Sequence, residues 1–273
     1  MSGASCLNCA AILQGPFCAS CGQRHIAVSD IGVATVLFEG FDFWRDKFAL
    51  LRDLGWLLVS PGRLTRNWLA GERVRHLHPA KVWILCSAFM AFAYQQVETD
   101  SAWVEAYTTR AIHLSCEQGE AIEWLRAADA AYGAFVGVVW TLLIFPWTVR
   151  LVLGPHRLGM AGYLVASLHA SAAAGLVTAA TFCVWDVARQ LMEHDASNLL
   201  ALMAGGVATM LFSLSAQAAY TISVLWSGLG LTFRETLAAS LVSVVLLVVS
   251  TLVLGLPTLL LMRVLVEAVL TPS

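Results

Sequence analysis

A chain of 273 residues with 59% hydrophobic and only 12% charged residues is too poor in charge for an ordinary soluble domain, where about a quarter of the residues are charged. The formal net charge of −2 gives no overall basic field, so we expect no nucleic-acid partner. No basic start precedes an early apolar run, so we expect no cleaved secretory signal and assign that role to the first membrane segment.

The N-terminal segment, 1–25, predicts a zinc ribbon. Its cysteines form two C-x2-C pairs, and each pair can offer two thiolates to one tetrahedral ion: Cys6 with Cys9, and Cys18 with Cys21. We predict a structural zinc ion with four thiolate ligands and no open position for catalysis. A rubredoxin-like iron site and two disulfides are the alternatives, and a cytoplasmic location argues against the disulfides.

The next segment, 26–79, predicts short amphipathic helices. Apolar residues recur at helical spacing through 29–41 and 48–59 and again after Pro61-Gly62. The stretch 48–59 contains Arg52 and Asp53 and has only twelve residues, so it is too charged and too short to cross a bilayer. We expect these helices to lie on the inner leaflet, and a small soluble helical domain is the alternative.

A basic cluster lies between Arg63 and Lys81, directly before apolar sequence. It holds five of the sixteen Lys and Arg residues. Such a cluster beside a hydrophobic segment is typical of the cytoplasmic face of a membrane. We expect contacts with lipid headgroups or a partner from Arg63, Arg66, Arg73, Arg75 and Lys81.

The remainder, 80–273, predicts an all-α polytopic membrane domain with about five transmembrane helices. The expected spans are about 80–97, 131–153, 161–184, 199–226 and 237–262. With the N-terminus inside, twelve Lys and Arg residues fall on the inner side and four on the outer side. This distribution satisfies the positive-inside rule, so we expect a cytoplasmic N-terminus and a C-terminus on the opposite side.

Several motifs resemble an uncharacterised family of bacterial inner-membrane proteins, a domain of unknown function. The family begins with a C-x2-C … C-x2-C-G-Q ribbon, which CASCGQ at 18–23 matches. It continues with a Pro-Gly and a Gly-x-Arg motif before the first span, which Pro61-Gly62 and the stretch 68–73 match, followed here by His78-Pro79. The resemblance implies a ribbon joined to a helical membrane domain in the bacterial inner membrane. In that membrane the C-terminus, expected opposite the cytoplasmic N-terminus, is periplasmic. It implies no activity.

A polar site is expected inside the membrane around His169, Gln217 and Ser213. An ionisable side chain within a span is costly in lipid and must find a partner, so His169 is a functional candidate. The alternative is a neutral His169 that bonds to Gln217 or a serine and helps two helices to pack. The functional reading is a polar cavity, open to the cytoplasm, that holds a lipid headgroup or a small polar ligand.

These observations lead us to expect a non-enzymatic membrane adaptor or assembly factor. A closed zinc module is typically an interaction or stability element, and here it precedes a body without a recognisable reaction centre. We expect partners among membrane lipids and either a protein or a second copy of the chain. The alternative is a transporter, channel or lipid-handling protein that uses His169 and Gln217. A membrane enzyme ranks third, because no acid–base or nucleophilic pair can be located.

Overall fold

The computed structural model describes residues 4–25, 31–38, 47–96, 137–154, 158–192, 199–246 and 249. Helices dominate these residues, and no strand longer than an isolated bridge occurs among them. The elements are α1 (Val33–Phe38), α2 (Lys47–Val59), α3 (Pro61–Leu69), α4 (Pro79–Gln96), the π-helix η2 (Trp140–Ile144), α7 (Phe145–Leu153), α8 (Met160–Met192), α9 (Leu199–Ser223) and the π-helix η4 (Val224–Gly228). A further helical stretch covers 233–246.

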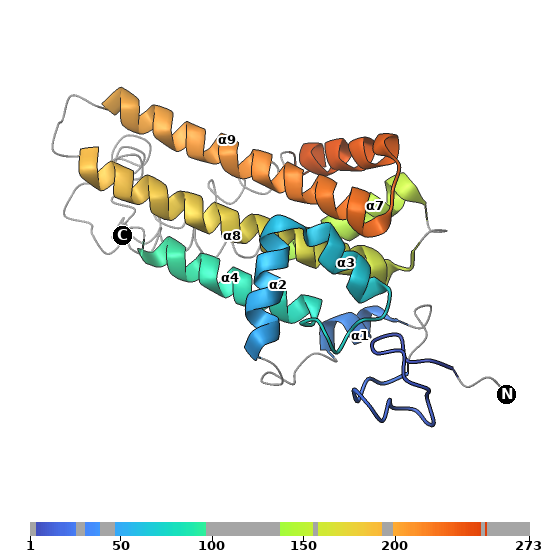
Figure 1. Cartoon of the computed structure of the whole chain (residues 1–273). Helices are drawn as coiled ribbons and strands as arrows, with labels where there is room; N and C mark the ends of the chain where they lie inside the picture. The colour runs from blue at the N-terminus through green and yellow to red at the C-terminus, as the bar shows by residue number, and fades with distance from the viewer. Residues whose placement is uncertain are drawn as a thin grey trace, which may run out of the picture.

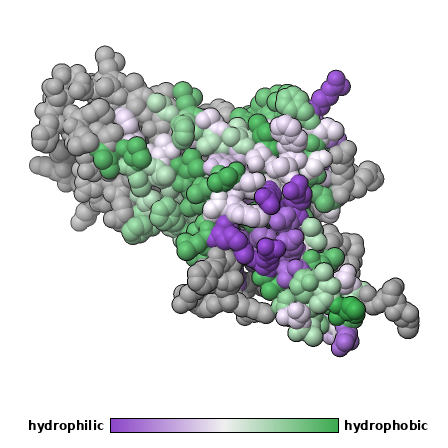
Figure 2. Space-filling view, in the orientation of Figure 1, coloured by the Kyte–Doolittle hydropathy of each residue, from purple (hydrophilic) through white to green (hydrophobic). Residues whose placement is uncertain are grey.

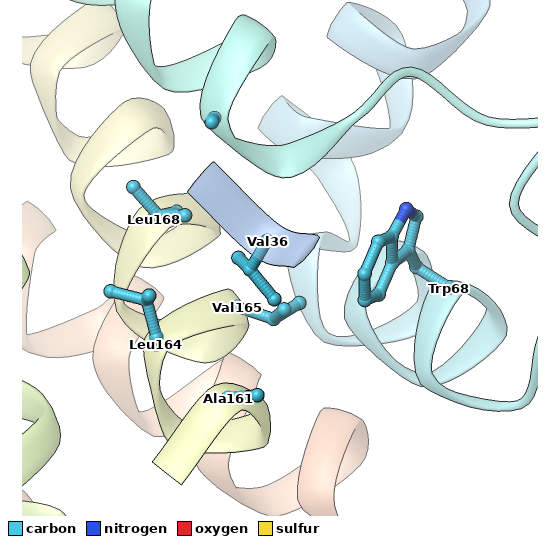
Figure 3. Close-up of a cluster of buried hydrophobic side chains, with 7 residues drawn as sticks. Val36, Trp68, Ala161, Leu164, Val165 and Leu168 are labelled. Atoms are coloured by element: carbon cyan, nitrogen blue, oxygen red, sulfur yellow. The ribbon is translucent and has the colours of Figure 1, made fainter. Parts of the chain in front are cut away.

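The long helix α8 is the centre of the fold. Both α4 and α9 pack along it, and α2 runs across α4 and α8 at a steep angle (Figure 1). The first turns of α8 present Ala161, Leu164, Val165 and Leu168 on one face, as the i, i+3, i+4, i+7 spacing dictates. That face packs against α1 and α3, because side chains from both helices complete the same buried cluster (Figure 3).

Prolines begin or interrupt three of the helices. Pro61 and Pro79 are the first residues of α3 and α4, where a missing N–H costs no helical hydrogen bond. Pro146 instead follows η2 within a continuous helical stretch, 137–153. Proline cannot bond to the carbonyl four residues earlier and its ring crowds that carbonyl, so the wider π turn directly before it accommodates the interruption.

The five predicted spans are not supported. Within the described residues, one helix is long and apolar enough to cross a membrane, Met160–Trp185, which covers the third expected span. The apolar parts of the first and second expected spans form shorter helices, Pro79–Ala93 and Gly137–Leu153. Hydropathy along the chain does not separate the two cases, because apolar helices that pack on each other and apolar helices that face lipid have the same composition. The segment between the first and second expected spans, 98–130, lies outside the described residues, and so does the end of the fifth expected span.

The short helix α3 belongs to the same packed body as α8. It lies against η4 and α8, and it buries Pro61, Gly62, Leu64, Thr65 and Trp68. A Cβ atom added at Gly62 would lie 1.9 Å from Ser227 Oγ and 2.3 Å from Ser223 O, so only glycine permits this approach. The amphipathic pattern of 61–69 therefore buries its apolar side against other helices.

Candidate metal centre and its contacts with the helical body

The N-terminal segment folds into two similar knuckles. One is closed by a bridge between Ser5 and Ile12 and the other by a bridge between Phe17 and Arg24. The same backbone hydrogen bond follows the first cysteine of each C-x2-C pair: Ala10 N donates to Cys6 O and Gly22 N to Cys18 O, both at 2.8 Å. Ala10 and Gly22 also share a positive φ, 61° and 73°. The repeated sequence spacing thus gives a repeated backbone.

The four cysteine sulfurs converge on one point. All four Sγ atoms lie within 4.8 Å of one another, with Cys6 and Cys21 at 3.6 Å and Cys9 and Cys18 at 3.5 Å. A tetrahedral ion with metal–sulfur bonds of about 2.3 Å requires sulfur–sulfur distances of about 3.8 Å, so the arrangement fits such an ion. These four cysteines can therefore hold a metal ion, as the sequence spacing predicted.

The knuckle backbone also favours a thiolate at Cys18. The backbone N–H of Cys21 donates to its sulfur and lowers the pKa of Cys18 to about 6. Burial has the opposite effect on the second cysteine of this pair and raises the pKa of Cys21 to about 11. A metal ion at this point would supply the positive charge that lets both sulfurs lose their protons. With four thiolate ligands it would have a structural role.

The side chain of Gln23 joins the ribbon to the helical body. Its amide donates to Gly71 O at 2.8 Å, and its carbonyl accepts from the backbone N–H of Arg73 at 3.2 Å and of Val74 at 3.4 Å. Leu7 packs directly on Gly71, where φ is +105° and a Cβ would lie 2.7 Å from the Leu7 side chain. The two motifs that carry the family resemblance, C-G-Q and Gly-x-Arg, therefore contact each other.

A buried Asp–His pair lies behind this contact. Asp53 on α2 and His76 are both inaccessible to solvent, and Nδ1 of His76 donates to Asp53 Oδ1 at 3.0 Å. The Leu77 N–H donates to the other carboxylate oxygen at 2.6 Å, and Arg52 Nε donates to Oδ1 at 3.1 Å. Burial alone would raise the pKa of Asp53, but the bonds from His76 and Leu77 outweigh it and lower the pKa.

This pair was not predicted from the sequence. Asp53 served there only as evidence against a membrane span, although a lone acid within an apolar helix could have signalled a buried partner. A second histidine, His78, lies close by and bonds through Nε2 to Thr35 O at 3.2 Å. Burial, then the charges of Lys81 and Arg73, lower the pKa of His78 to about 4.

His169 bonds to α3. It is fully buried on α8, and its Nδ1 lies 3.0 Å from Thr65 Oγ1. Because the Thr65 hydroxyl donates to Pro61 O at 2.9 Å, its oxygen must accept from Nδ1–H of His169. That assignment leaves Nε2 of His169 as a buried acceptor without a hydrogen-bond partner.

The other residues of the expected membrane site lie on α9. The hydroxyl of Ser213 is buried without a hydrogen-bond partner, and Gln217 is partly buried. Among the described residues no hydrogen bond links either of them to His169. Their grouping with His169 stays a prediction, and the partner that the structure does give to His169, Thr65, was not selected from the sequence.

The residues of the basic cluster have different surroundings. Arg63 and Arg66 are exposed, and the Arg63 guanidinium lies 4.5 Å from the ring centre of Trp56. Arg73 is partly buried over Trp68 at 5.5 Å. Arg75 lies 3.9 Å from Glu72, and its carbonyl accepts from Arg52. Lys81, on the first turn of α4, is partly buried.

Comparison with known proteins adds a family for part of the chain. Residues 50–91 match a family described as a protein of unknown function, DUF3667. The DUF3667 match spans most of α2, all of α3 and most of α4, so it contains Asp53, His76, Thr65 and the backbone to which Gln23 bonds. No curated protein and no solved structure matches the chain.

Proposed function

We propose that this protein is a non-enzymatic adaptor or assembly factor of the bacterial inner membrane, whose zinc-bound ribbon binds a protein partner. The observation that carries the proposal is the orientation of the ribbon. One side is fixed to the helical body through Gln23 and Leu7, while Ile12 and Phe17 are 70% and 59% exposed on the remaining surface. Large exposed apolar side chains on a small rigid module are typical of a protein-binding surface.

Zinc is the proposed ion because four cysteine thiolates in a tetrahedral arrangement are its usual structural ligand set. The ion would fix the two knuckles relative to each other, and Gln23 would carry that fixed geometry to the loop after α3. No step of a reaction is assigned to it. The proposed role of the ion is to hold the ribbon in the shape that presents its partner-binding surface.

Membrane placement is part of the same proposal. Support comes from Met160–Trp185, from the further apolar helices, and from the concentration of arginine near the N-terminal end of the fold. We propose about five spans with a cytoplasmic ribbon. An impermeant thiol reagent applied to intact cells is expected to label Cys116, which lies between the first and second expected spans on the outer side, and not Cys6 or Cys21. The reverse labelling pattern would overturn this orientation.

The test of the adaptor is purification of the tagged full-length protein in mild detergent, with mass spectrometry of its proteins, lipids and metal. We expect one zinc ion and a stoichiometric protein partner. The double variant Ile12→Ser/Phe17→Ser should keep the zinc and lose the partner, and Cys18→Ser/Cys21→Ser should lose both. Val59→Ser, which removes an exposed apolar side chain from α2 instead, is the matched control and should keep both.

Two results would overturn the proposal that this protein is an adaptor. A partner that remains bound to both ribbon variants would place the binding surface elsewhere. An enriched lipid or solute in the absence of any protein partner would instead favour the transporter or lipid-handling alternative, whose site would include His169, Gln217 and Ser213.

A further inference from the structure

The corner between α2 and α3 has an exposed apolar side. Leu51 and Leu58 lie seven residues apart on one face of α2, and Val59 ends the helix. Leu51 is 73% and Val59 is 87% exposed, and Leu58 is also exposed. The opposite face of α2 is occupied: Leu57 packs against α8 and Asp53 bonds to His76. Leu51, Leu58 and Val59 therefore lie on a surface separate from the face of α2 that packs against the other helices.

Two arginines adjoin this surface on α3. Arg63 and Arg66 are three residues apart, so they lie on the same face, and both are exposed. In the part of the chain that the structure describes, neither forms an ion pair with a carboxylate, whereas Arg52 and Arg75 do. Trp56 lies under the Arg63 guanidinium and limits its freedom. Among the described residues, these two positive charges thus have no carboxylate partner, and the Trp56 ring positions the one on Arg63.

The basic and apolar parts meet where α2 ends and α3 begins, because Val59 lies four residues before Arg63. In Figure 2, hydrophilic surface over α3 and the adjoining loop borders hydrophobic surface near α2 and α4. The close approach of Gly62 to Ser223 and Ser227 holds the backbone of α3 against η4. An anionic head next to hydrocarbon is the chemical pattern that complements such a surface.

We propose that the α2–α3 corner binds one anionic phospholipid. Arg63 and Arg66 bind its phosphate group, and its acyl chains lie along Leu51, Leu58 and Val59. The Arg63–Trp56 pair suits this role, because aromatic rings are enriched at the level of the headgroups and arginine recognises phosphate through its forked donors. The inference rests on the proposed membrane placement and is independent of the ribbon's partner.

The experiment uses the full-length protein in detergent and adds equal amounts of phosphatidylglycerol and phosphatidylcholine. Bound lipid is measured by native mass spectrometry. The wild-type protein should retain phosphatidylglycerol preferentially. Each arginine lost should weaken retention about fivefold, so Arg63→Gln/Arg66→Gln should lose the preference. Arg63→Lys/Arg66→Lys keeps both charges and should retain much of it. Arg24→Gln, a charge change on the ribbon, is the control and should bind like the wild type.

Three results would overturn the inference. Unchanged selectivity in Arg63→Gln/Arg66→Gln, with its thermal unfolding like that of the wild type, would exclude these arginines. Equal thermal stabilisation by inorganic phosphate would show an anion site without a lipid. Displacement of the lipid by an acidic protein that requires the same arginines would show that the surface binds a protein and not a lipid. A different result, recovery of the chain in the soluble fraction of cells, would overturn the proposed membrane placement on which the inference rests. The other three results concern the lipid site alone, so the two kinds of failure can be told apart.

Discussion

The hydrogen bond between Thr65 and His169 is a polar contact between α3 and α8, next to an apolar part of the same interface. Breaking it leaves the Nδ1–H of a fully buried imidazole without an acceptor. An unsatisfied buried donor typically costs about 1–3 kcal/mol. The contact is therefore expected to be important for stability, whatever role Nε2 of His169 has.

We predict that Thr65→Val lowers the free energy of unfolding by about 1–3 kcal/mol, because it removes the hydroxyl while nearly conserving the volume of the side chain. Thr65→Ser, which keeps the hydroxyl, should lose much less. Denaturant unfolding in detergent, followed by tryptophan fluorescence, measures both variants. Equal stability of Thr65→Val and the wild type would contradict the assigned bond.

A second residue-scale prediction concerns His78, whose pKa is lowered from 6.5 to about 4. In the unfolded chain the imidazole binds a proton below pH 6.5, while in the folded chain it stays neutral down to about pH 4. Stability should therefore fall as the pH is lowered through this window, by up to about 3 kcal/mol. His78→Gln, whose amide can still donate to Thr35 O, should make stability less dependent on pH there. Unfolding free energies at several pH values test this, and an unchanged slope would refute it.

At the scale of elements, the contact between α3 and η4 depends on the absence of a side chain at Gly62. We predict that Gly62→Ala destabilises the protein by about 3 kcal/mol, because the new methyl group overlaps Ser227 and the Ser223 carbonyl and must push the helices apart. Gly55→Ala on α2 is the matched control. Nothing lies within 4 Å of its added Cβ, so it should stabilise α2 by up to about 1 kcal/mol. Thermal unfolding of the two variants should shift in opposite directions.

Several elements follow from local sequence alone. The helical spacing at 48–59 and the Pro-Gly after it predicted α2 and the start of α3. The third expected span, 161–184, falls within α8. The sequence did not predict whether each helix faces lipid or another helix, because an apolar stripe is equally suited to both. For that reason five spans were expected where the described residues contain one clear candidate.

At the scale of the molecule, the ribbon and the helical body are two units joined by few contacts. None of the buried apolar clusters of the described residues includes a side chain from 4–25. In the part of the chain that the structure describes, the connection includes Gln23, Leu7 and a bond from the Arg75 N–H to Asn8 Oδ1 at 3.2 Å. The order of the ribbon is thus expected to depend on its metal ion and not on the core of the body.

We predict that a chelator removes the metal and unfolds the ribbon without unfolding the helices. Amide exchange should become fast at 4–25 and faster at 71–75, where Gln23 bonds, while helical circular dichroism changes little. Re-addition of zinc should restore protection. Cys18→Ser should behave like the chelated wild type. A cooperative loss of helix on chelation would show instead that the ribbon is part of the core.

The sequence by itself predicted the four cysteines that can hold a metal ion and the positions of several helices, since both depend on spacing over a few residues. Two C-x2-C pairs bring thiolates together through local turns, and their arrangement in space agrees with that expectation. Only the tertiary structure decided which polar groups meet. Thr65 and His169 are 104 residues apart, and Gln23 and Gly71 are 48 apart. Such pairs leave no periodic pattern in the sequence, because they form only when the packing of apolar faces brings two distant segments into contact.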